Sequence, residues 1–403
     1  MLELPAVLGG APAFDRPVPL TRPTLRSDDE VARSMRAVLE SGMTTNATEV
    51  AALERETADY LGTAHVVAVS SCTTGLILLL RALGVRGEVV LPSFTFMASG
   101  HAVRWNGTRE RFADIDPENW TLDRRSAERA FGSNTGAVMA VHTFGAPCRV
   151  EELEQLCADR GVPLIFDAAH GFGGRYADGT MIGAHGAAEV FSLSPTKPFS
   201  AGEGGLIATS DDDLAAELRL AREYGNPGDY DSRFAGLNGR MPELSAVVGR
   251  AALRDFPDWM QRRRGLAQRY ADRLAGIPGI ALQRRPEGAL SAHKDLSLRV
   301  DATAFGLTRD QLSRCLAAEH VTVRHYFDPP LHRQTAYQPA GAETDLPVTD
   351  DLSGRILTLP LYSHMKESVV DRISAVVEHL HTWAGSVGDM LDGDRRRPAT
   401  TLT

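Results

Sequence analysis

The sequence predicts an α/β protein: a large domain with a mostly parallel sheet flanked by helices, followed by a smaller C-terminal α+β domain. Seven short apolar runs rich in β-branched residues recur between residues 65 and 210. Helical patterns separate most of them, which is typical of parallel strands joined by crossover helices. Beyond about residue 253 this alternation stops, and long helices accompany a single predicted strand.

The predicted elements follow one another in a regular order. Apolar residues recur at helical spacing from about Ser27 to Leu61, interrupted by SGMTTNAT, so we expect two helices and a loop. The expected strands then lie at 65–71, 88–94, 111–116, 137–144, 163–169, 188–194 and 205–210. The expected helices between them lie around 74–83, 97–106 and 150–161.

The second domain is predicted from residues 254–385, after a large domain of residues 1–253 that includes the N-terminal helical segment. It is expected to hold an arginine-rich helix, one strand and two further helices, at 261–277, 295–301, 308–320 and 367–383. The last residues, 386–403, are polar and rich in turn formers. We expect them to form a flexible tail.

Composition narrows the class of protein. The net charge of -9 argues against a nucleic-acid partner, because such proteins carry a basic surface. The four cysteines are scattered without CxxC spacing, so neither a disulfide framework nor a zinc site is predicted. The N-terminus lacks the basic and apolar segments of a signal peptide, and no run approaches the ~20 apolar residues of a membrane span. We therefore expect a cytoplasmic enzyme with reduced thiols.

An aspartate and a lysine follow two consecutive predicted strands. Asp167 ends the apolar run 163–166, at the edge where open α/β sheets bind ligands. Lys197 follows the next strand, in a loop with serines and a glycine cluster at 202–205 that allows close backbone approach. Each residue alone is usually a helix cap, an ion-pair partner or a solvated charge. Together they favour a functional pair.

This pair is what pyridoxal 5'-phosphate (PLP) chemistry requires. A lysine amine forms a Schiff base with the cofactor, and Lys197 would later move the α-proton of the substrate. An anionic partner keeps the pyridine nitrogen protonated, so that the ring withdraws electrons. Asp167 is able to supply that charge-assisted hydrogen bond.

A phosphate site is predicted at the start of the apolar helix around 74–83. The stretch SSCTTG (70–75) joins a strand to this helix, and a helix N-terminus with hydroxyl residues attracts anions. An ordinary helix cap is the alternative. Ser192, five residues before Lys197, adds a further hydroxyl and favours the phosphate interpretation.

These segments resemble, in order and spacing, the PLP-dependent sugar aminotransferases of the DegT/DnrJ/EryC1 family, which have the aspartate-aminotransferase (type I) fold. The resemblance covers nearly the whole chain and implies the same PLP-transferase type I fold here. The segments that carry it are PVPLTRPTL, GMTTNATEVAALE, AVSSCTTGL, PSFTFMAS, DIDPENWTLD, VHTFGAPC, DAAHGFGGRY, FSLSPTKPFSAGEGG, GLNGRMPELSAVVG, HYFDPPLHRQTAY and LTLPLYSHM.

The resemblance implies roles for single residues. Lys197 becomes the Schiff-base lysine, Asp167 the pyridinium partner, and His170 a neighbour of the ring hydroxyl. Asn238 is expected to reach the phosphate from the other subunit of a homodimer. The remaining implied cofactor residues are the phosphate ligands Thr73, Thr74 and Ser192 and the ring-stacking Phe96.

Two residues depart from the family pattern. Cys72 stands where the family commonly has glycine, so it either packs in the core or lines the site. His170 replaces the commoner glutamine, which leaves its charge state open.

Substrate residues are expected in the small domain. HYFDPPLHRQTAY offers His325, Tyr326 and His332. Metal ligation by the two histidines is disfavoured, because no carboxylate or cysteine stands at ligand spacing in this segment, and we predict no metal site. The cluster Arg262 to Arg264 either meets a nucleotide diphosphate or, as is usual for charges on a helix, faces solvent.

The expected activity is transfer of an amino group from L-glutamate, or glutamine, to the ketone of a TDP-linked 4-keto-6-deoxysugar in antibiotic deoxyaminosugar biosynthesis. Amination at C3 and aminocyclitol substrates are the near alternatives. A sugar dehydratase of the same family is disfavoured, because those enzymes replace the Schiff-base lysine with histidine. A PLP-binding regulator is disfavoured by the lack of a basic DNA-binding module, and a nicotinamide dehydrogenase by the lack of a suitable GxGxxG turn.

Overall fold

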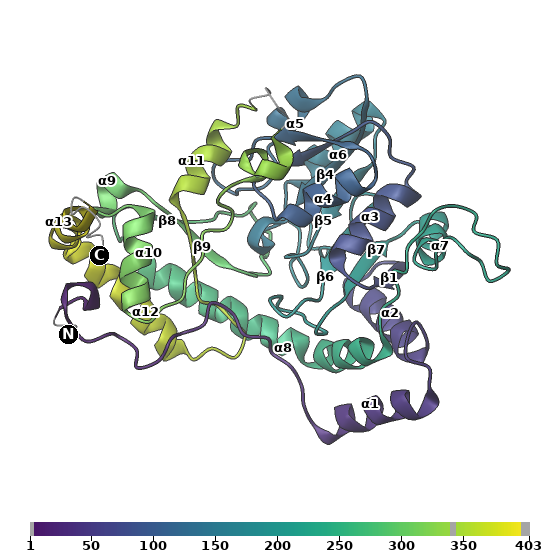
Figure 1. The fold of residues 1–403 in the computed structure, drawn as a ribbon, viewed down its shortest axis with the longest axis horizontal. Coiled ribbons are helices and arrows are strands. Elements are labelled where there is room, and N and C mark those ends of the chain that lie inside the picture. Colours follow the sequence, from purple (N-terminus) through teal and green to yellow (C-terminus); the bar gives the residue numbers. More distant parts are fainter. Residues whose placement is uncertain (1–3, 339–343, 396–403) are drawn as a thin grey trace, which may run out of the picture.

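The computed structural model describes residues 4–338 and 344–395 and confirms the α/β prediction (Figure 1). Its main sheet has the strand order β1-β7-β6-β5-β4-β2-β3. β7 runs antiparallel to both of its neighbours, and every other pairing is parallel. The strands are β1 (His65–Val69), β2 (Glu88–Pro92), β3 (Arg109–Ala113), β4 (Thr135–Val141), β5 (Leu164–Asp167), β6 (Ala188–Ser192) and β7 (Gly205–Thr209).

Helices cover both faces of this sheet, because its strands are apolar on both sides. Val66 and Ala68 pack into the core on one face, and Val67 and Val69 into the core on the other. The first core includes α2 (Thr48–Leu61), α5 (Arg124–Ala130), α6 (Val150–Arg160) and part of α8 (Glu243–Leu274). The second includes α3 (Cys72–Ala82), α4 (Met97–Trp105) and α7 (Asp212–Ala221).

The C-terminal part builds a separate core around a three-stranded antiparallel sheet, with the order β10-β9-β8. Its strands are β8 (Ile280–Leu282), β9 (Leu296–Val300) and β10 (Ile356–Leu359). Its helices include α9 (Ala302–Phe305), α10 (Arg309–Ala318), α11 (Pro347–Arg355) and α12 (Glu367–Thr382).

The long helix α8 joins the two parts (Figure 1). Phe256 and Met260 are buried in the core of the large sheet, whereas Leu266 and Tyr270 are buried in the C-terminal core. We propose that the domains divide between Met260 and Leu266, within the helix and slightly beyond residue 253.

Both ends of the chain differ from the expectation. The N-terminal segment does not pack with the large domain: Ala13 and Val18 are buried in the C-terminal core. Only further on does α1 (Asp29–Ser41) pack on α8. The tail prediction is wrong for part of its length, because α13 (Ala384–Arg395) buries Val387 and Leu391 in the same core. Residues 396–403 lie outside the described residues.

The composition of α13 explains why its helix was not expected. The stretch is rich in glycine and aspartate, which favour turns over helices. Its buried residues Ala384, Val387 and Leu391 stand three and four positions apart, but one of the three is a small alanine, so the helical period is weak in the sequence. Within the described residues no helix is both long and apolar enough to cross a membrane.

Candidate active site

A cavity of about 390 Å³ lies at the carboxyl ends of β5 and β6. The starts of α3 and α4 and a segment of the small domain complete its walls. The predicted cofactor residues that line it are Cys72, Thr73, Phe96, Asp167, His170, Ser192 and Lys197. The structure therefore brings together side chains that are up to 125 residues apart in the sequence.

Asp167 is buried and held in a fixed orientation. The hydroxyl of Ser99 donates a hydrogen bond to Oδ2 at 2.6 Å, and the amide of Ala169 donates one to Oδ1 at 3.1 Å. Ser99 in turn exchanges a 2.9 Å hydrogen bond with Thr95, four residues earlier. We missed Ser99 in the sequence, where the only signal is a pair of hydroxyls four residues apart in PSFTFMAS.

Lys197 lies in the loop between β6 and β7, and its side chain lines the cavity. Burial of the ammonium group lowers the pKa of Lys197 to about 8, with the nearby charge of Lys294 acting in the same direction. Asp295, Cys72 and Asp167 act in the opposite direction. Roughly a tenth of the lysine is therefore the nucleophilic free amine at about pH 7, far more than for a lysine of ordinary pKa.

His170 is a neutral imidazole of defined tautomer. The backbone amide of Phe144 donates a hydrogen bond to its Nδ1 at 3.2 Å, so the proton sits on Nε2. Burial, together with the charges of Lys197 and Lys294, holds the pKa of His170 well below its usual value. The charge state that the sequence left open is thus decided by the surroundings of the ring.

The start of α3 supplies hydrogen-bond donors to the same cavity. Ser71 caps the helix by accepting a hydrogen bond from the amide of Thr74 at 3.0 Å, and the helix leaves its first backbone N–H groups without intrahelical acceptors. Gly205 permits β7 to approach this turn, since a Cβ there would lie 2.6 Å from the amide nitrogen of Cys72. Ser71 and Thr73 line the cavity, but the hydroxyl of Thr74 is occupied by Ser70 and Ser71.

Cys72 both packs and lines the cavity. Its thiol is buried, 3.7 Å from the carbonyl oxygen of Val190 and 3.9 Å from Oδ1 of Asp167. Burial, with the neighbouring carboxylate, raises the pKa of Cys72 well above its usual value. The residue is an inert thiol rather than a nucleophile.

The two phenylalanines of PSFTFMAS have different environments. Phe94 is buried in an aromatic cluster with Phe144 and Phe327. Phe96 precedes α4, lines the cavity and is 50% exposed. Phe96 is therefore the one available to a bound ring.

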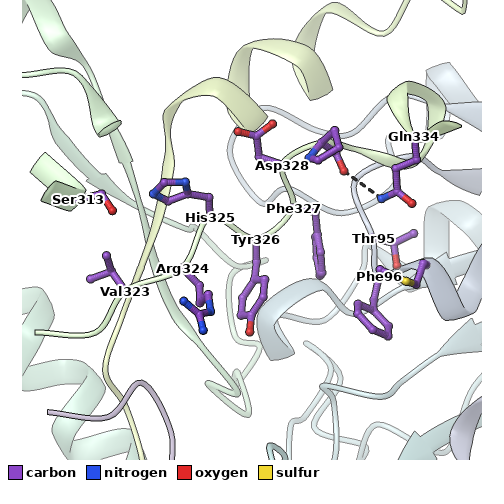
Figure 2. Close-up of a pocket in the computed structure, with 12 residues that line it drawn as sticks. Thr95, Phe96, Ser313, Val323, Arg324, His325, Tyr326, Phe327, Asp328 and Gln334 are labelled. Atoms are coloured by element: carbon purple, nitrogen blue, oxygen red, sulfur yellow. Dashed lines mark hydrogen bonds between the residues drawn. The ribbon is translucent and has the colours of Figure 1, made fainter. Parts of the chain in front are cut away.

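A second cavity of about 540 Å³ adjoins the first, with Thr95, Phe96, Tyr326 and Phe327 lining both. Figure 2 shows Arg324 and Tyr326 side by side on its wall, with His325 on the other side of their backbone. Of the three predicted substrate residues, His325 and Tyr326 are thus placed at this cavity.

His332 lines neither cavity. It is buried, its Nδ1 lies 2.6 Å from the hydroxyl of Ser93, and its Nε2 lies 3.1 Å from Asp350. These contacts join the small domain to the end of β2, which is a structural role.

The arginine cluster on α8 is not a uniform solvated face. Arg262 is exposed, but Arg263 is buried and donates hydrogen bonds to the carbonyl oxygens of His293 and Lys294. Arg264 donates to the carbonyl oxygen of Gly173 at 2.6 Å. Two of the three arginines therefore hold backbone segments in place.

Lys294 is a cavity residue that we missed in the sequence. It is buried and lines the cavity beside Lys197, and its Nζ lies 2.9 Å from both carboxylate oxygens of Asp295. The only sequence signal is a Lys-Asp pair directly before the predicted strand at 295–301.

Asn238 lies outside the cavity of its own chain. It is exposed in the segment between α7 and α8, next to Gly239, whose carbonyl oxygen accepts a hydrogen bond from the amide of Ser70. The backbone of Asn238 pairs with Glu223, just after the end of α7.

Residues 26–378 match the model of the DegT/DnrJ/EryC1/StrS aminotransferase family. The chain belongs to this family. It is accordingly an aminotransferase, and the cavity at the ends of β5 and β6 is the candidate active site of a DegT/DnrJ/EryC1/StrS enzyme.

Three curated relatives match almost their full length. The chain is 36% identical over 360 residues to the erythromycin biosynthesis sensory transduction protein EryC1 of Saccharopolyspora erythraea, covering 88% of this chain and 95% of the relative. It is 27% identical over 371 residues to the dTDP-4-amino-4,6-dideoxy-D-glucose transaminase of Escherichia coli, covering 90% and 98%. It is 32% identical over 367 residues to the dTDP-3-amino-3,4,6-trideoxy-alpha-D-glucose transaminase of Streptomyces venezuelae, covering 90% and 94%.

Among solved structures, DesI in the presence of its TDP-sugar product superimposes with a TM-score of 0.89 and 35% identity. The match covers 97% of this chain and 99% of DesI. The type I aminotransferase architecture expected from the sequence is confirmed by this agreement.

Proposed function

We propose that this aminotransferase uses PLP to move an amino group from L-glutamate to the ketone of a TDP-linked 4-keto-6-deoxysugar, in the biosynthesis of an antibiotic deoxyaminosugar. The observation that carries the proposal is the presence of Lys197 and Asp167 in one cavity, at the ends of two neighbouring strands. Glutamine is the alternative donor.

The residues present fit PLP. The cofactor needs an amine for its aldehyde, an anion for its ring nitrogen and donors for its phosphate. Lys197 offers an amine whose pKa is about 8, and Asp167 offers a buried, oriented carboxylate. The start of α3, with Ser71 and Thr73, offers N–H and hydroxyl donors, and Ser192 adds another hydroxyl to the cavity wall.

Each of these groups has a defined task. When bound, PLP supplies an electron-withdrawing ring that carries the amino group between the two halves of the reaction. The Nζ of Lys197 removes the proton from the α-carbon of the donor and returns a proton to the acceptor. The carboxylate of Asp167 would hold the proton of the ring nitrogen of bound PLP, and Nε2–H of His170 would be available as a hydrogen-bond donor to the ring oxygen.

The sugar is assigned from the second cavity and from the relatives. The adjoining cavity of about 540 Å³ shares four residues with the first and extends the space open to a nucleotide-linked sugar. Arg324, His325 and Tyr326 line that side and offer polar contacts to the nucleotide part. Amination at C4 is favoured by the likeness to DesI and to the E. coli enzyme, whereas the S. venezuelae relative keeps C3 as the main alternative.

We further propose a cytoplasmic homodimer with a shared active site. Asn238 is exposed, and its backbone pairs with Glu223 near the end of α7, so its side-chain amide is available to contact the phosphate site of a second copy. All four cysteines are free and buried, which agrees with a reducing compartment.

An amino-transfer assay tests the proposal. Purified enzyme with PLP and L-glutamate is given either TDP-4-keto-6-deoxyglucose or its 3-keto isomer, and the aminated product is identified. We expect the 4-amino sugar. Transfer to the 3-keto isomer alone moves the assignment to C3, and transfer to neither overturns the deoxysugar substrate in favour of an aminocyclitol precursor.

The Lys197→Ala variant tests the catalytic role. Loss of the proton-moving amine is expected to reduce turnover by roughly 100- to 10,000-fold and to remove the absorbance of the lysine Schiff base. Lys366→Ala is the matched control, because Lys366 is exposed at the start of α12. An unchanged cofactor spectrum in Lys197→Ala contradicts the assignment.

A further inference from the structure

Lysine is rare in this chain, and its placement is uneven. The sequence has forty arginines but only three lysines, Lys197, Lys294 and Lys366. Lys197 and Lys294 line the same cavity, whereas Lys366 is exposed at the start of α12. A protein that otherwise uses arginine for its cations therefore keeps a second, compact ammonium group beside the catalytic lysine.

The ammonium group of Lys294 has bonding capacity left. Its Nζ lies 2.9 Å from Oδ1 and Oδ2 of Asp295, and 5.2 Å from the centre of the Tyr326 ring. An ammonium group has three N–H donors, and one carboxylate engages at most two of them. At least one donor remains for a molecule in the cavity.

The backbone around Lys294 is held in an uncommon conformation. His293 has a φ of +45°, in the left-handed region that non-glycine residues rarely adopt. The amide of Lys294 donates to the carbonyl oxygen of Phe144 at 2.9 Å, and the buried Arg263 binds the carbonyl oxygens of His293 and Lys294. Local strain that neighbouring contacts maintain in this way is typical of functional sites.

An amino-acid donor brings a negative charge into this cavity. Among the described lining residues, Asp167 and Glu203 are acidic and repel a carboxylate, and His170 is neutral. Lys197 is committed to the chemistry. Lys294 is then the one lining cation, within the described part of the chain, that is able to pair with the donor.

We propose that Lys294 is the specificity residue that binds a carboxylate of the amino donor, with Asp295 holding its ammonium group in place when the donor is absent. The assignment rests on the proposed aminotransfer from an acidic amino acid. It predicts a preference for dicarboxylic donors over donors with neutral side chains.

Binding of glutarate, a dicarboxylate without an amino group, tests this without turnover. Calorimetric titration of the PLP-loaded protein compares wild type with Lys294→Gln and with the control Lys366→Gln. Loss of a charge-assisted hydrogen bond is expected to weaken glutarate binding by about ten- to a hundredfold in Lys294→Gln. Lys366→Gln is expected to bind like wild type, and both variants are expected to keep the cofactor absorbance.

A second variant separates ligand binding from a purely structural ion pair. Asp295→Asn leaves the ammonium group without its internal anion, so glutarate is expected to bind at least as tightly as to wild type. A structural pair predicts instead that both variants melt at lower temperature with unchanged glutarate affinity. Three results overturn the proposal: lower melting temperatures with unchanged glutarate affinity, weaker glutarate binding to Asp295→Asn, and no glutarate binding to wild type. If Lys294→Gln does not fold, the measurement on Asp295→Asn still decides.

The acceptor side is tested with dTDP as a second probe. Weakened dTDP binding and unchanged glutarate binding in Lys294→Gln assign the lysine to the nucleotide and overturn the proposal. Failure of the proposed function differs from failure of the Lys294 assignment. If the proposed function is wrong, the wild-type enzyme transfers no amino group, but the glutarate titrations still measure whether Lys294 binds a carboxylate.

Discussion

The hydroxyl of Ser99 donates a 2.6 Å hydrogen bond to Oδ2 of Asp167. Both residues are buried, and they lie on different elements, the first turn of α4 and the last residue of β5. The contact fixes the plane of the carboxylate toward the cavity, so we regard Ser99 as a positioning residue for Asp167.

Replacing Ser99 with alanine tests this relationship. Loss of a hydrogen bond to a charged group costs about 1.5–3 kcal/mol, so kcat is expected to fall roughly tenfold or more, with the KM for glutamate little changed. Steady-state kinetics and the dissociation constant of PLP measure the effect. Ser41→Ala in α1 is the control, and a KM effect without a kcat effect speaks against positioning.

The pH dependence of Lys197 follows from its surroundings. Because burial lowers the pKa of this amine to about 8, labelling by trinitrobenzenesulfonate in cofactor-free protein is expected to rise steeply up to about pH 8 and to level off above about pH 9. An unperturbed lysine, titrating near about 10.4, would still be gaining reactivity there. Mass spectrometry of the labelled peptide supplies the measurement, and a midpoint near the unperturbed value refutes the prediction.

The same shift has a consequence for stability. Between about pH 8 and about 10.5 the unfolded chain holds more protons on this lysine than the folded chain does. The stability of the cofactor-free protein is therefore expected to gain a contribution from Lys197 as the pH rises through this window. Comparison of denaturation curves for wild type and Lys197→Met isolates the contribution.

His170 is expected to act as a neutral hydrogen-bond donor. Its Nδ1 accepts from Phe144 and its pKa is held well below the usual value, so only Nε2–H points to other partners. His170→Gln retains an N–H donor and is expected to keep activity within about tenfold of wild type. His170→Phe has no such donor, and its activity is expected to fall by a larger factor. Equal losses in the two variants would show that shape rather than the donor matters.

The acid side of the stability profile tests the same histidine. Its folded pKa is lowered, so the unfolded chain binds the extra proton as the pH falls below about 6.5. Stability is then lost with falling pH, and the loss is expected to be smaller in His170→Gln. Denaturant titrations on either side of this pH provide the comparison.

The proposed shared active site predicts complementation between inactive variants. Lys197→Ala and Asn238→Ala each impair every site of their own homodimer if Asn238 serves the neighbouring subunit. In a mixed dimer one site receives both mutations and the other receives neither, so random mixing is expected to restore about a quarter of wild-type activity. Activity measured after co-refolding tests this, and no recovery contradicts a shared site.

Local sequence patterns predicted much of this protein. All seven strands of the main sheet and the three expected helices α3, α4 and α6 lie where apolar periodicity indicated, whereas α5, between β3 and β4, was not predicted. The sequence predicted that Lys197 and Asp167 lie close together, because each follows a strand of one sheet and parallel strands end at the same edge, and both line one cavity in the structure. The domain division was harder to predict, since α8 runs through it without a break.

Residues whose role depends on distant partners were not accessible in this way. Thr74 was predicted to bind the phosphate and His332 the substrate, because their residue types suit those roles. In the structure the hydroxyl of Thr74 is hydrogen-bonded to Ser71, and the ring of His332 contacts Ser93 and Asp350. Residues 386–395 were predicted to be a tail, but they form part of α13 because Val387 and Leu391 pack into the C-terminal core.

The sequence by itself determined the order of the elements and the two residues at the strand ends, because hydrophobic periodicity reports which backbone each segment adopts. Only the tertiary structure decided that His170 is neutral, that Ser99 orients Asp167, and that Lys294 stands beside Lys197. These properties arise from burial and from contacts between segments that are far apart in the sequence, and such contacts form only when the chain folds.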